Sequence, residues 1–315
     1  MSLKHSVFLP VGFGQEFART TDPVAAFETV IETGRIADEY GYETVWILDH
    51  LLTAPPSQEY LFECWTTVAA LLRETERVRV GQMVSGNGYR NPALLAKMAS
   101  TVDVLGRGRL TFGIGAGWYE PDYQAFGYEF LDGPSRLRQL REAMQIILSM
   151  WTKDETTFEG EFYRVQGAIN QPRGVQQPHI PILIAGAGEK VTLKTAAQFA
   201  DICNVNESPE GLKRKFDVLK KHCETVGRDY DDIVRTTTTI CIIGDTDEEA
   251  KALVPPGASA IYPGDVGAYG LIGTPDTIRE RLAAYEEAGV QELAINFLDP
   301  TDLDVLRRYG AEFIR

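Results

Sequence analysis

Cysteine is scarce in this chain, and its spacing excludes two classes of protein. Four cysteines occur among 315 residues, and no pair of them forms a C-x-x-C motif. A disulfide-bonded secreted scaffold or a zinc-binding module would need closer and more regular spacing. We therefore expect reduced thiols and no metal site at these positions: Cys64, Cys203, Cys223 and Cys241.

Long apolar runs and basic charge are also lacking. No segment approaches the ~18 consecutive apolar residues of a membrane span, and no secretory signal opens the sequence. Lysine and arginine number 31 against 45 aspartates and glutamates, so the net charge is −14. A surface of this sign repels nucleic acid and anionic membranes. We expect a cytoplasmic protein that binds neither.

What the chain does contain is a regular alternation of short β-rich runs with segments of helical periodicity. This alternation predicts an α/β protein, and eight strands with intervening helices predict a (β/α)₈ TIM barrel. A doubly wound sheet is the alternative, but it would place its glycine-rich turn after the first strand. The eight predicted strands cover residues 5–10, 43–48, 78–84, 109–115, 180–186, 201–205, 234–244 and 292–298.

Two of the predicted helices carry clear end signals. Asp22 and Pro23 suit the N-cap and first position of one helix, which Gly41 ends. Thr274 and Pro275 repeat this start in the stretch "GTPDTIRERLAAYEEAG", where a glycine again ends the helix.

The chain is longer than a plain barrel, which takes about 250 residues. We expect one domain, 1–315, that carries its surplus in three insertions, at about 119–133, 152–179 and 253–273. The second is predicted to be a small hairpin followed by a proline-rich link. The third is rich in Gly, Pro and Tyr, as active-site lids often are.

The stretch "GIGAGWYEPDY" (113–123) resembles a phosphate-binding fingerprint but has the wrong spacing for one. Its third glycine comes one residue early, and Pro121 disfavours helical backbone at Glu120. In a barrel this stretch follows the fourth strand, at the end where active sites form. We expect Gly115, Ala116 and Gly117 to let the backbone approach a flat ligand, while a tight turn between strand and helix is the alternative.

A second glycine-rich segment, "IAGAGEK", is the better phosphate candidate. Gly186, Ala187 and Gly188 precede a helix predicted to begin near Glu189, whose free N–H groups and positive dipole end suit an anion. Lys190 could add a donor. The carboxylate of Glu189 would repel phosphate unless it points away.

His50 is the one histidine of four placed at a predicted strand end. An imidazole at the barrel mouth can donate or accept a substrate proton, so we predict a catalytic role, with a structural hydrogen bond as the alternative. Asp49 could orient His50, bind a cofactor or cap the following turn. Trp118 and Tyr119, just past the fourth strand, are predicted to form a wall of the substrate pocket.

These segments together resemble the luciferase-like monooxygenase superfamily, which has the bacterial luciferase fold, and most closely its branch that uses the deazaflavin coenzyme F420. The resemblance runs from "SVFLP" to "GVQELAINF". It depends on "WILDH", "YRNPALLAKMASTVDVLGRGRLTFGIGAGWYEPDYQAFG", "FEGEFYRV", "PILIAGAGEK" and "GTPDTIRERLAAYEEAGV".

The resemblance implies a cofactor at the carboxyl ends of the strands. Asp49 would contact it and His50 would act as acid–base, while the backbone of residues 185–188, from Ala185 to Gly188, would contact the cofactor as well. The family also implies a bulge with a non-prolyl cis peptide at Met83–Val84 or Val84–Ser85, against which the cofactor ring rests.

Two departures from the family bear on cofactor and substrate. Ala116 stands where the luciferases place an arginine on the FMN phosphate, which weakens an FMN interpretation. Trp118 stands where the sugar-phosphate dehydrogenases of the deazaflavin branch carry a glutamate, so the substrate stays an unidentified small organic molecule.

The resemblance therefore predicts an F420-dependent oxidoreductase. An FMN-dependent monooxygenase, supplied with reduced flavin by a separate enzyme, is the first alternative. A non-catalytic flavin-binding protein is the second alternative. A homodimer is compatible with each of them.

Overall fold

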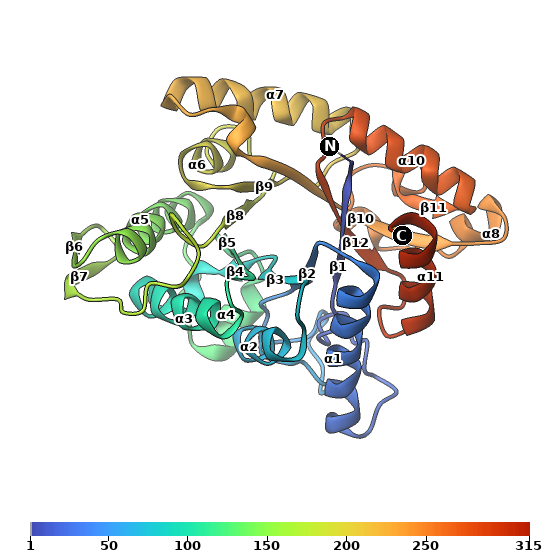
Figure 1. Ribbon diagram of the computed structural model, residues 1–315, viewed down its shortest axis with the longest axis horizontal. Helices are drawn as coiled ribbons and strands as arrows, with labels where there is room; N and C mark the ends of the chain where they lie inside the picture. The colour runs from blue at the N-terminus through green and yellow to red at the C-terminus, as the bar shows by residue number, and fades with distance from the viewer. Residues whose placement is uncertain (1) are drawn as a thin grey trace.

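Eight parallel strands form a closed barrel in the computed structural model, which describes residues 2–315 (Figure 1). The last strand pairs with the first, Glu292 opposite Lys4, and so closes the ring. The predicted (β/α)₈ barrel is confirmed, and each predicted β run overlaps one barrel strand. The barrel strands are β1 (Lys4–Phe8), β2 (Thr44–Ile47), β3 (Arg79–Gln82), β5 (Leu110–Gly115), β8 (Ile182–Ala185), β9 (Ile202–Asn204), β10 (Val234–Ile243) and β12 (Glu292–Phe297).

Helices surround the barrel (Figure 1). The main ones are α1 (Pro23–Tyr40), α2 (Cys64–Glu74), α3 (Pro92–Leu105), α5 (Gly133–Thr152), α6 (Thr192–Phe199), α7 (Pro209–Val226), α8 (Asp247–Ala252), α10 (Pro275–Glu287) and α11 (Leu303–Phe313). None of the helices in residues 2–315 is both long and apolar enough to cross a bilayer.

The predicted helix ends are confirmed. The Asp22 side chain accepts a hydrogen bond from the backbone N–H of Val24, and Gly41 follows α1 in the left-handed conformation at φ 85°. Thr274 caps α10 in the same way. A free side-chain oxygen at the N-cap satisfies an N–H group that the helix itself leaves without a partner.

The barrel interior is filled by side chains. All residues of β2 and β5 are buried, because helices cover the outside of the strands and side chains fill the inside. A ligand must therefore bind at an end of the barrel and not along its axis. The inner cluster consists of Phe8, Trp46, Met83, Leu183 and Ala294.

The third predicted strand is interrupted. β3 ends at Gln82, the Met83–Val84 peptide is cis, and pairing resumes with β4 (Ser85–Gly86), where Ser85 lies opposite Ile114 of β5. The predicted non-prolyl cis bond at the end of this strand is confirmed, at the first of its two expected positions.

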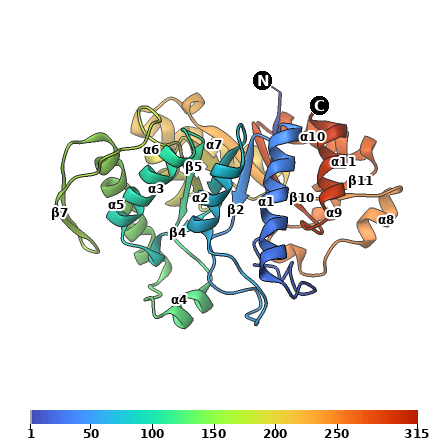
Figure 2. The same cartoon turned by 60° about the horizontal axis from the view of Figure 1, so that its bottom comes forward.

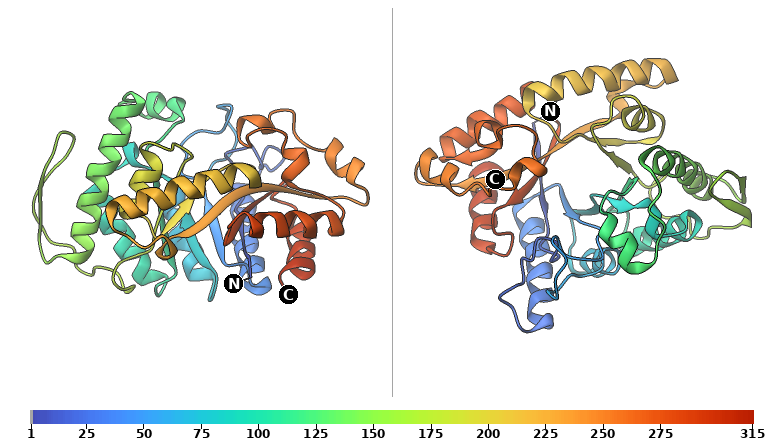
Figure 3. Two further views of the ribbon diagram at one scale, coloured as in Figure 1. Left: turned by 90° about the horizontal axis from the view of Figure 1, so that it is seen from above. Right: turned by 180° about the vertical axis from the view of Figure 1, so that it is seen from behind.

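The insertions fold as three separate structures. β6 (Thr156–Glu159) and β7 (Arg164–Ala168) form the predicted hairpin, which projects outward beside α5 (Figure 3). Residues 253–273, the lid segment, contain η3 (Ala258–Ala260), α9 (Val266–Tyr269) and β11 (Leu271–Gly273), and β11 pairs with the end of β10.

The first insertion forms a helix, α4 (Glu120–Phe126). The expectation that Pro121 keeps Glu120 out of helical structure was wrong, because proline is tolerated in the first turn of a helix. α4 lies at the end of the molecule opposite the two termini, which is the carboxyl end of the barrel strands (Figure 2).

Candidate functional site

His50 follows β2 at the carboxyl end of the barrel, and an aspartate that lies 72 residues away in the sequence holds its ring. Nδ1 of His50 is 2.8 Å from Oδ2 of Asp122 on α4. The His50 side chain is 10% exposed, and that of Asp122 is fully buried. Asp122, and not the adjacent Asp49, therefore orients the imidazole.

Asp122 accepts hydrogen bonds on both carboxylate oxygens. The Tyr89 hydroxyl donates to Oδ2 at 2.8 Å, and the backbone N–H groups of Leu51 and Leu52 donate to Oδ1 at 3.1 and 2.8 Å. Burial acts to raise the pKa of Asp122, but the hydrogen bonds from His50, Tyr89 and the backbone outweigh burial and lower the pKa. Asp122 is a carboxylate at neutral pH.

Aromatic side chains enclose the imidazole of His50. Phe13 stacks on its face, with ring centroids 3.9 Å apart and planes within 15°. Trp118 and Tyr119 meet it edge-on, at centroid distances of 5.6 and 5.5 Å. The structure thus brings the two predicted wall residues to His50. Trp118 is 66% exposed, which is unusual for so large an apolar residue and leaves much of its surface available to a ligand.

Asp49 is fully buried and is bound by an arginine. Arg90 contacts both carboxylate oxygens, at 2.6 and 3.0 Å, and also reaches Glu63 at 2.7 Å. The backbone N–H of Gly86 donates to Asp49 Oδ2 at 3.1 Å. Burial raises the pKa of Asp49, and Arg90 opposes that rise. Asp49 joins the loops after β2 and β4, and its contact with a cofactor stays a prediction.

The glycines of "GIGAGWYEPDY" make room for other parts of the protein. A Cβ atom at Gly113 would lie 1.7 Å from the Gln82 carbonyl oxygen, and one at Gly115 would lie 2.7 Å from Cγ2 of Val84. Gly117 has a φ of 79°, and a Cβ there would meet the Tyr123 hydroxyl at 1.9 Å. These contacts within the protein account for the pattern without a ligand.

The residues of the bulge after β3 pack against the barrel interior. Met83 belongs to the inner cluster, and Val84 and Ala185 pack against it. The Ser85 hydroxyl accepts a hydrogen bond from Trp65 Nε1 at 3.0 Å, so the structure gives this side chain a supporting role. Cofactor binding by Met83, Val84, Ser85, Gly115, Ala116 and Gly117 stays a prediction.

The second glycine-rich segment lies next to the first, because β8 pairs with β5. The helix that follows begins at Thr192 and not near Glu189 as expected, since residues 189–191 form a turn and Gly186 has a φ of 135°. α6 has no side-chain cap, and the N–H of Leu193 in its first turn donates to the Gly188 carbonyl oxygen at 3.0 Å. Among residues 2–315 only the N–H groups of Thr192 and Lys194 remain without a partner in this turn, and these could face an anion. Cofactor binding by Ala185, Gly186, Ala187 and Gly188 stays a prediction.

The negative charge of Glu189 is paired with two cations, so it repels an anion at this loop less than an unpaired carboxylate would. Its carboxylate is bound by Lys215 at 2.9 Å and by Arg214 at 2.8 Å, both on α7, and the hydrogen bond from Lys215 lowers the pKa of Glu189. Lys215 also donates to the Ala187 carbonyl oxygen at 2.9 Å, and His222 contacts the Glu189 carbonyl oxygen at 2.7 Å. Residues 187–189 are thus anchored on an outer helix.

The lid segment is fastened to the same end of the barrel by two asparagine side chains. The amide of Asn206, after β9, donates to the carbonyl oxygen of Ile261. The amide of Asn296, on β12, donates to the hydroxyl of Tyr262 at 2.8 Å. The predicted lid therefore borders the site on the side of β9 and β12.

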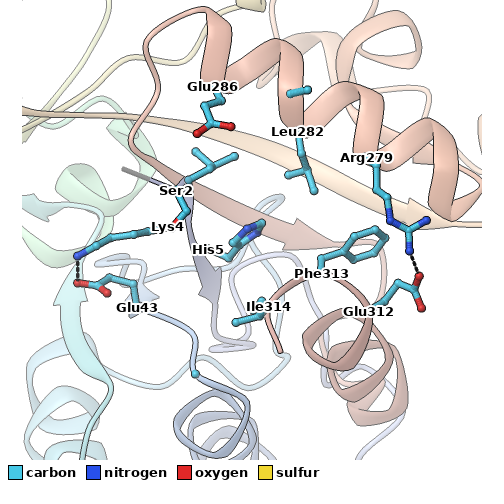
Figure 4. Close-up of a pocket in the computed structure, with 13 residues that line it drawn as sticks. Ser2, Lys4, His5, Glu43, Arg279, Leu282, Glu286, Glu312, Phe313 and Ile314 are labelled. Atoms are coloured by element: carbon cyan, nitrogen blue, oxygen red, sulfur yellow. Dashed lines mark hydrogen bonds and ion pairs between the residues drawn. The ribbon is translucent and has the colours of Figure 1, made fainter.

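A cavity of about 560 Å³ lies at the opposite end of the barrel, beside the start of β1 (Figure 4). Its charged groups are largely paired within the protein, Lys4 with Glu43 and Arg279 with Glu312. His5, which lines this cavity, is partly buried, its Nδ1 lies 2.8 Å from the Tyr309 hydroxyl, and burial lowers its pKa to about 4. This cavity is separate from the His50 site.

Sequence analysis missed several residues of the site. Asp122 and Phe13 contact His50, and Tyr89 contacts Asp122. These three residues come from segments that follow three different strands. The one available signal was the rule that loops after barrel strands meet at one end. Arg90 was inside a segment recognised as part of the family pattern, but nothing in the sequence pairs it with Asp49.

A histidine held by a carboxylate at the carboxyl ends of parallel barrel strands is typical of an enzyme active site. Comparison with known proteins identifies the family. The model of the family described as luciferase-like monooxygenase matches residues 4–269. The chain belongs to this family, as the resemblance implied.

Relatives within the family use either of two cofactors. The chain is 26% identical over 302 residues to the FMNH(2)-dependent dimethylsulfone monooxygenase of Pseudomonas putida, covering 84% of this chain and 81% of the relative. It is 31% identical over 213 residues to the F420-dependent glucose-6-phosphate dehydrogenase of Amycolatopsis mediterranei (strain U-32), covering 66% and 62%.

A solved structure confirms the fold over the whole length. An F420-dependent secondary alcohol dehydrogenase in complex with an F420–acetone adduct superposes with a TM-score of 0.80. The alignment covers 99% of this chain and 98% of that one, at 17% sequence identity.

Proposed function

We propose that the protein is an F420-dependent oxidoreductase that moves a hydride between reduced deazaflavin and a small organic substrate, with His50 as the acid–base residue. The observation that carries this proposal is the buried His50, held at Nδ1 by Asp122 2.8 Å away at the carboxyl end of the barrel. A histidine held in this way is suited to exchanging a proton through its other ring nitrogen.

The residues present fit a phosphorylated cofactor. Gly186 and Gly188 both pack against the side chain of Thr192. A Cβ atom added at either glycine would lie 2.9 or 2.8 Å from that side chain, so this loop has no room for larger residues. At the start of α6 the N–H groups of Thr192 and Lys194 would be the donors to a phosphate, since the N–H of Leu193 is bonded to the Gly188 carbonyl oxygen, and Lys190 is exposed in the preceding turn. Ala185 to Gly188 would hold the phosphate-bearing part of the cofactor.

When bound, the deazaflavin would supply or take up the hydride. The chain provides the proton: transfer of a hydride to a carbonyl carbon leaves an oxygen that needs one, and oxidation of an alcohol needs one removed. Nε2 of His50 would give or take that proton at the substrate oxygen. Phe13, Trp118 and Tyr119 would exclude water from the imidazole and orient an apolar part of the substrate.

An FMN-dependent monooxygenase is the second candidate function, because a relative that covers 84% of this chain is FMNH(2)-dependent. Ala116 argues for the deazaflavin, since the luciferase arginine on the FMN phosphate is missing from that position. Trp118 replaces the glutamate of the sugar-phosphate dehydrogenases, so we do not propose a sugar phosphate as substrate.

Side-by-side titration with F420 and FMN tests this proposal. One charged hydrogen bond to phosphate is worth roughly 1.5–3 kcal/mol, so F420 should bind about 10- to 100-fold more tightly than FMN. Equal affinities would reject the F420 assignment in favour of the monooxygenase. Reduced F420 is then mixed with a panel of small ketones and aldehydes, and reoxidation is followed by absorbance. Binding without any turnover would support the non-catalytic alternative.

A further inference from the structure

The carboxylate of Asp122 has a different task at each oxygen. Oδ1 accepts the backbone N–H groups of Leu51 and Leu52, at 3.1 and 2.8 Å. Oδ2 lies 2.8 Å from Nδ1 of His50 and accepts the Tyr89 hydroxyl at 2.8 Å. One oxygen thus holds the loop after β2, and the other faces the imidazole.

We propose that Asp122 is a positioning residue that fixes the tautomer of His50, keeping the proton on Nδ1 and leaving Nε2 as the nitrogen that exchanges protons at the barrel mouth. A carboxylate can only accept hydrogen bonds, so the ring nitrogen that faces it must be the donor. In the neutral imidazole the other nitrogen then carries a lone pair.

The surroundings of the ring support this assignment. Within residues 2–315 the structure gives Nε2 of His50 no hydrogen-bond partner, whereas Nδ1 has Asp122. Phe13 covers one face of the ring at a centroid distance of 3.9 Å and holds its plane, and a half-turn within that plane would place the carbon Cδ2 instead of Nδ1 against the Asp122 carboxylate. The exposed tenth of the side chain is the part that a substrate can reach.

The same contacts predict how an amide at position 122 would behave. In Asp122→Asn the backbone N–H groups of Leu51 and Leu52 need an acceptor, so the amide oxygen must take the place of Oδ1. The amide nitrogen then faces His50 and donates to Nδ1. The neutral imidazole must move its proton to Nε2, which inverts the tautomer while the backbone keeps its acceptor.

Nitrogen NMR of the full-length chain, labelled with ¹⁵N in its four histidines, measures the tautomer directly. Spectra are recorded at about pH 9, more than two units above the ordinary imidazole pKa of about 6.5. The His50→Gln variant identifies the signals of His50. We expect a protonated Nδ1 and a bare Nε2 in the wild type, and the reverse in Asp122→Asn.

Tyr89→Phe is the matched control. It removes a hydrogen bond from the same oxygen of Asp122 but leaves the carboxylate, so His50 should keep the wild-type pattern. Circular dichroism and thermal unfolding establish that each variant is folded. A wild-type His50 protonated at Nε2, or an Asp122→Asn protein that keeps the proton on Nδ1, would overturn the proposal. The wild-type spectrum decides even if the variant does not fold.

The effect on turnover rests on the proposed function, whereas the tautomer does not. If His50 is the acid–base residue, Asp122→Asn should lower kcat by about 10²-fold or more, with the Kd of F420 changed only a few-fold. Tyr89→Phe should reduce kcat far less. A switched tautomer in a protein that does not bind F420 would reject the proposed function and leave the role of Asp122 intact.

Discussion

Gly113 of β5 and Gln82 of β3 approach so closely that a Cβ atom on the glycine would lie 1.7 Å from the glutamine carbonyl oxygen. The chain reaches this proximity where β3 breaks off and β4 begins. The glycines at positions 113 and 115 are thus needed because Gln82 of the neighbouring strand and Val84 of the bulge leave no space for a side chain there.

Gly113→Ala should destabilise the fold by about 3 kcal/mol, the upper end of the cost of overpacking a core, because the new Cβ would meet the backbone carbonyl oxygen of Gln82, which cannot move aside cheaply. Gly133→Ala, at the start of α5, is the control. A Cβ there meets nothing within 4 Å, so the substitution should be neutral or stabilise by about 0.4–1 kcal/mol. Urea unfolding measures both. Equal midpoints for the two variants would refute the steric explanation.

His50→Ala should separate proton transfer from cofactor binding. We expect kcat to fall by about 10²–10⁴, the usual contribution of a general acid–base, while the Kd of F420 stays within a few-fold. His50→Asn keeps a hydrogen-bonding group without an exchangeable imidazole proton and should be as slow as the alanine variant. Loss of cofactor affinity at unchanged kcat would make His50 a binding or structural residue.

Ala116→Arg should restore affinity for FMN. A guanidinium at this position would contribute a charged hydrogen bond to the phosphate, which predicts about 10- to 100-fold tighter FMN binding. Ala116→Met, which adds length without charge, is the control for the effect of size at this half-buried position. If the two variants bind FMN equally, the missing arginine does not explain cofactor choice.

Glu292→Gln should make stability less dependent on pH. Glu292 is buried, and burial raises its pKa, while the hydrogen bond from the Ser6 hydroxyl opposes the rise. Below the unfolded-state pKa of about 4.3 the carboxyl is protonated in both the folded and the unfolded state, so its ionisation does not change the free energy of unfolding. As the pH rises from there to the folded-state pKa, the unfolded state alone loses the proton, and stability falls.

The stability gap between Glu292→Gln and the wild type should therefore be near zero at pH 4 and should widen toward pH 8 in favour of the variant. Each unit by which the pKa is raised is worth about 1.4 kcal/mol. Glu129→Gln, at an exposed position, should show no such widening. Chemical unfolding at several pH values measures the gap, and a gap independent of pH would contradict the prediction.

The fold was predictable because its local signals agree with one another. Buried strands appear as apolar runs, and Asp22, Pro23 and Gly41 mark the ends of α1 where the structure has them. The break between β3 and β4 was predictable from the family resemblance but not from the run itself, because no proline or turn sequence separates Gln82 from Ser85. β11 was missed because it is a three-residue strand inside a glycine-rich segment.

The site was predictable only in part, because its decisive contacts join distant segments. The position of His50 after a strand placed it at the barrel mouth. Of the three roles left open for Asp49, orienting His50 is the one that the structure gives to Asp122 instead, and nothing local in the sequence shows that Arg90 binds the Asp49 carboxylate. Asp122 lies in a helix that proline was thought to exclude, so no pattern drew attention to it.

Because α7 anchors residues 187–189, engineering of cofactor preference in this protein must include residues of an outer helix as well as those at the barrel mouth. Lys215 and His222 lie on the outer layer, yet they hold the carbonyl groups of Ala187 and Glu189 at 2.9 and 2.7 Å. A mutant library aimed at cofactor preference and restricted to the barrel mouth would leave out the two side chains that support this loop from behind. Libraries that include Lys215 and His222 explore loop conformations that substitutions at the mouth cannot reach.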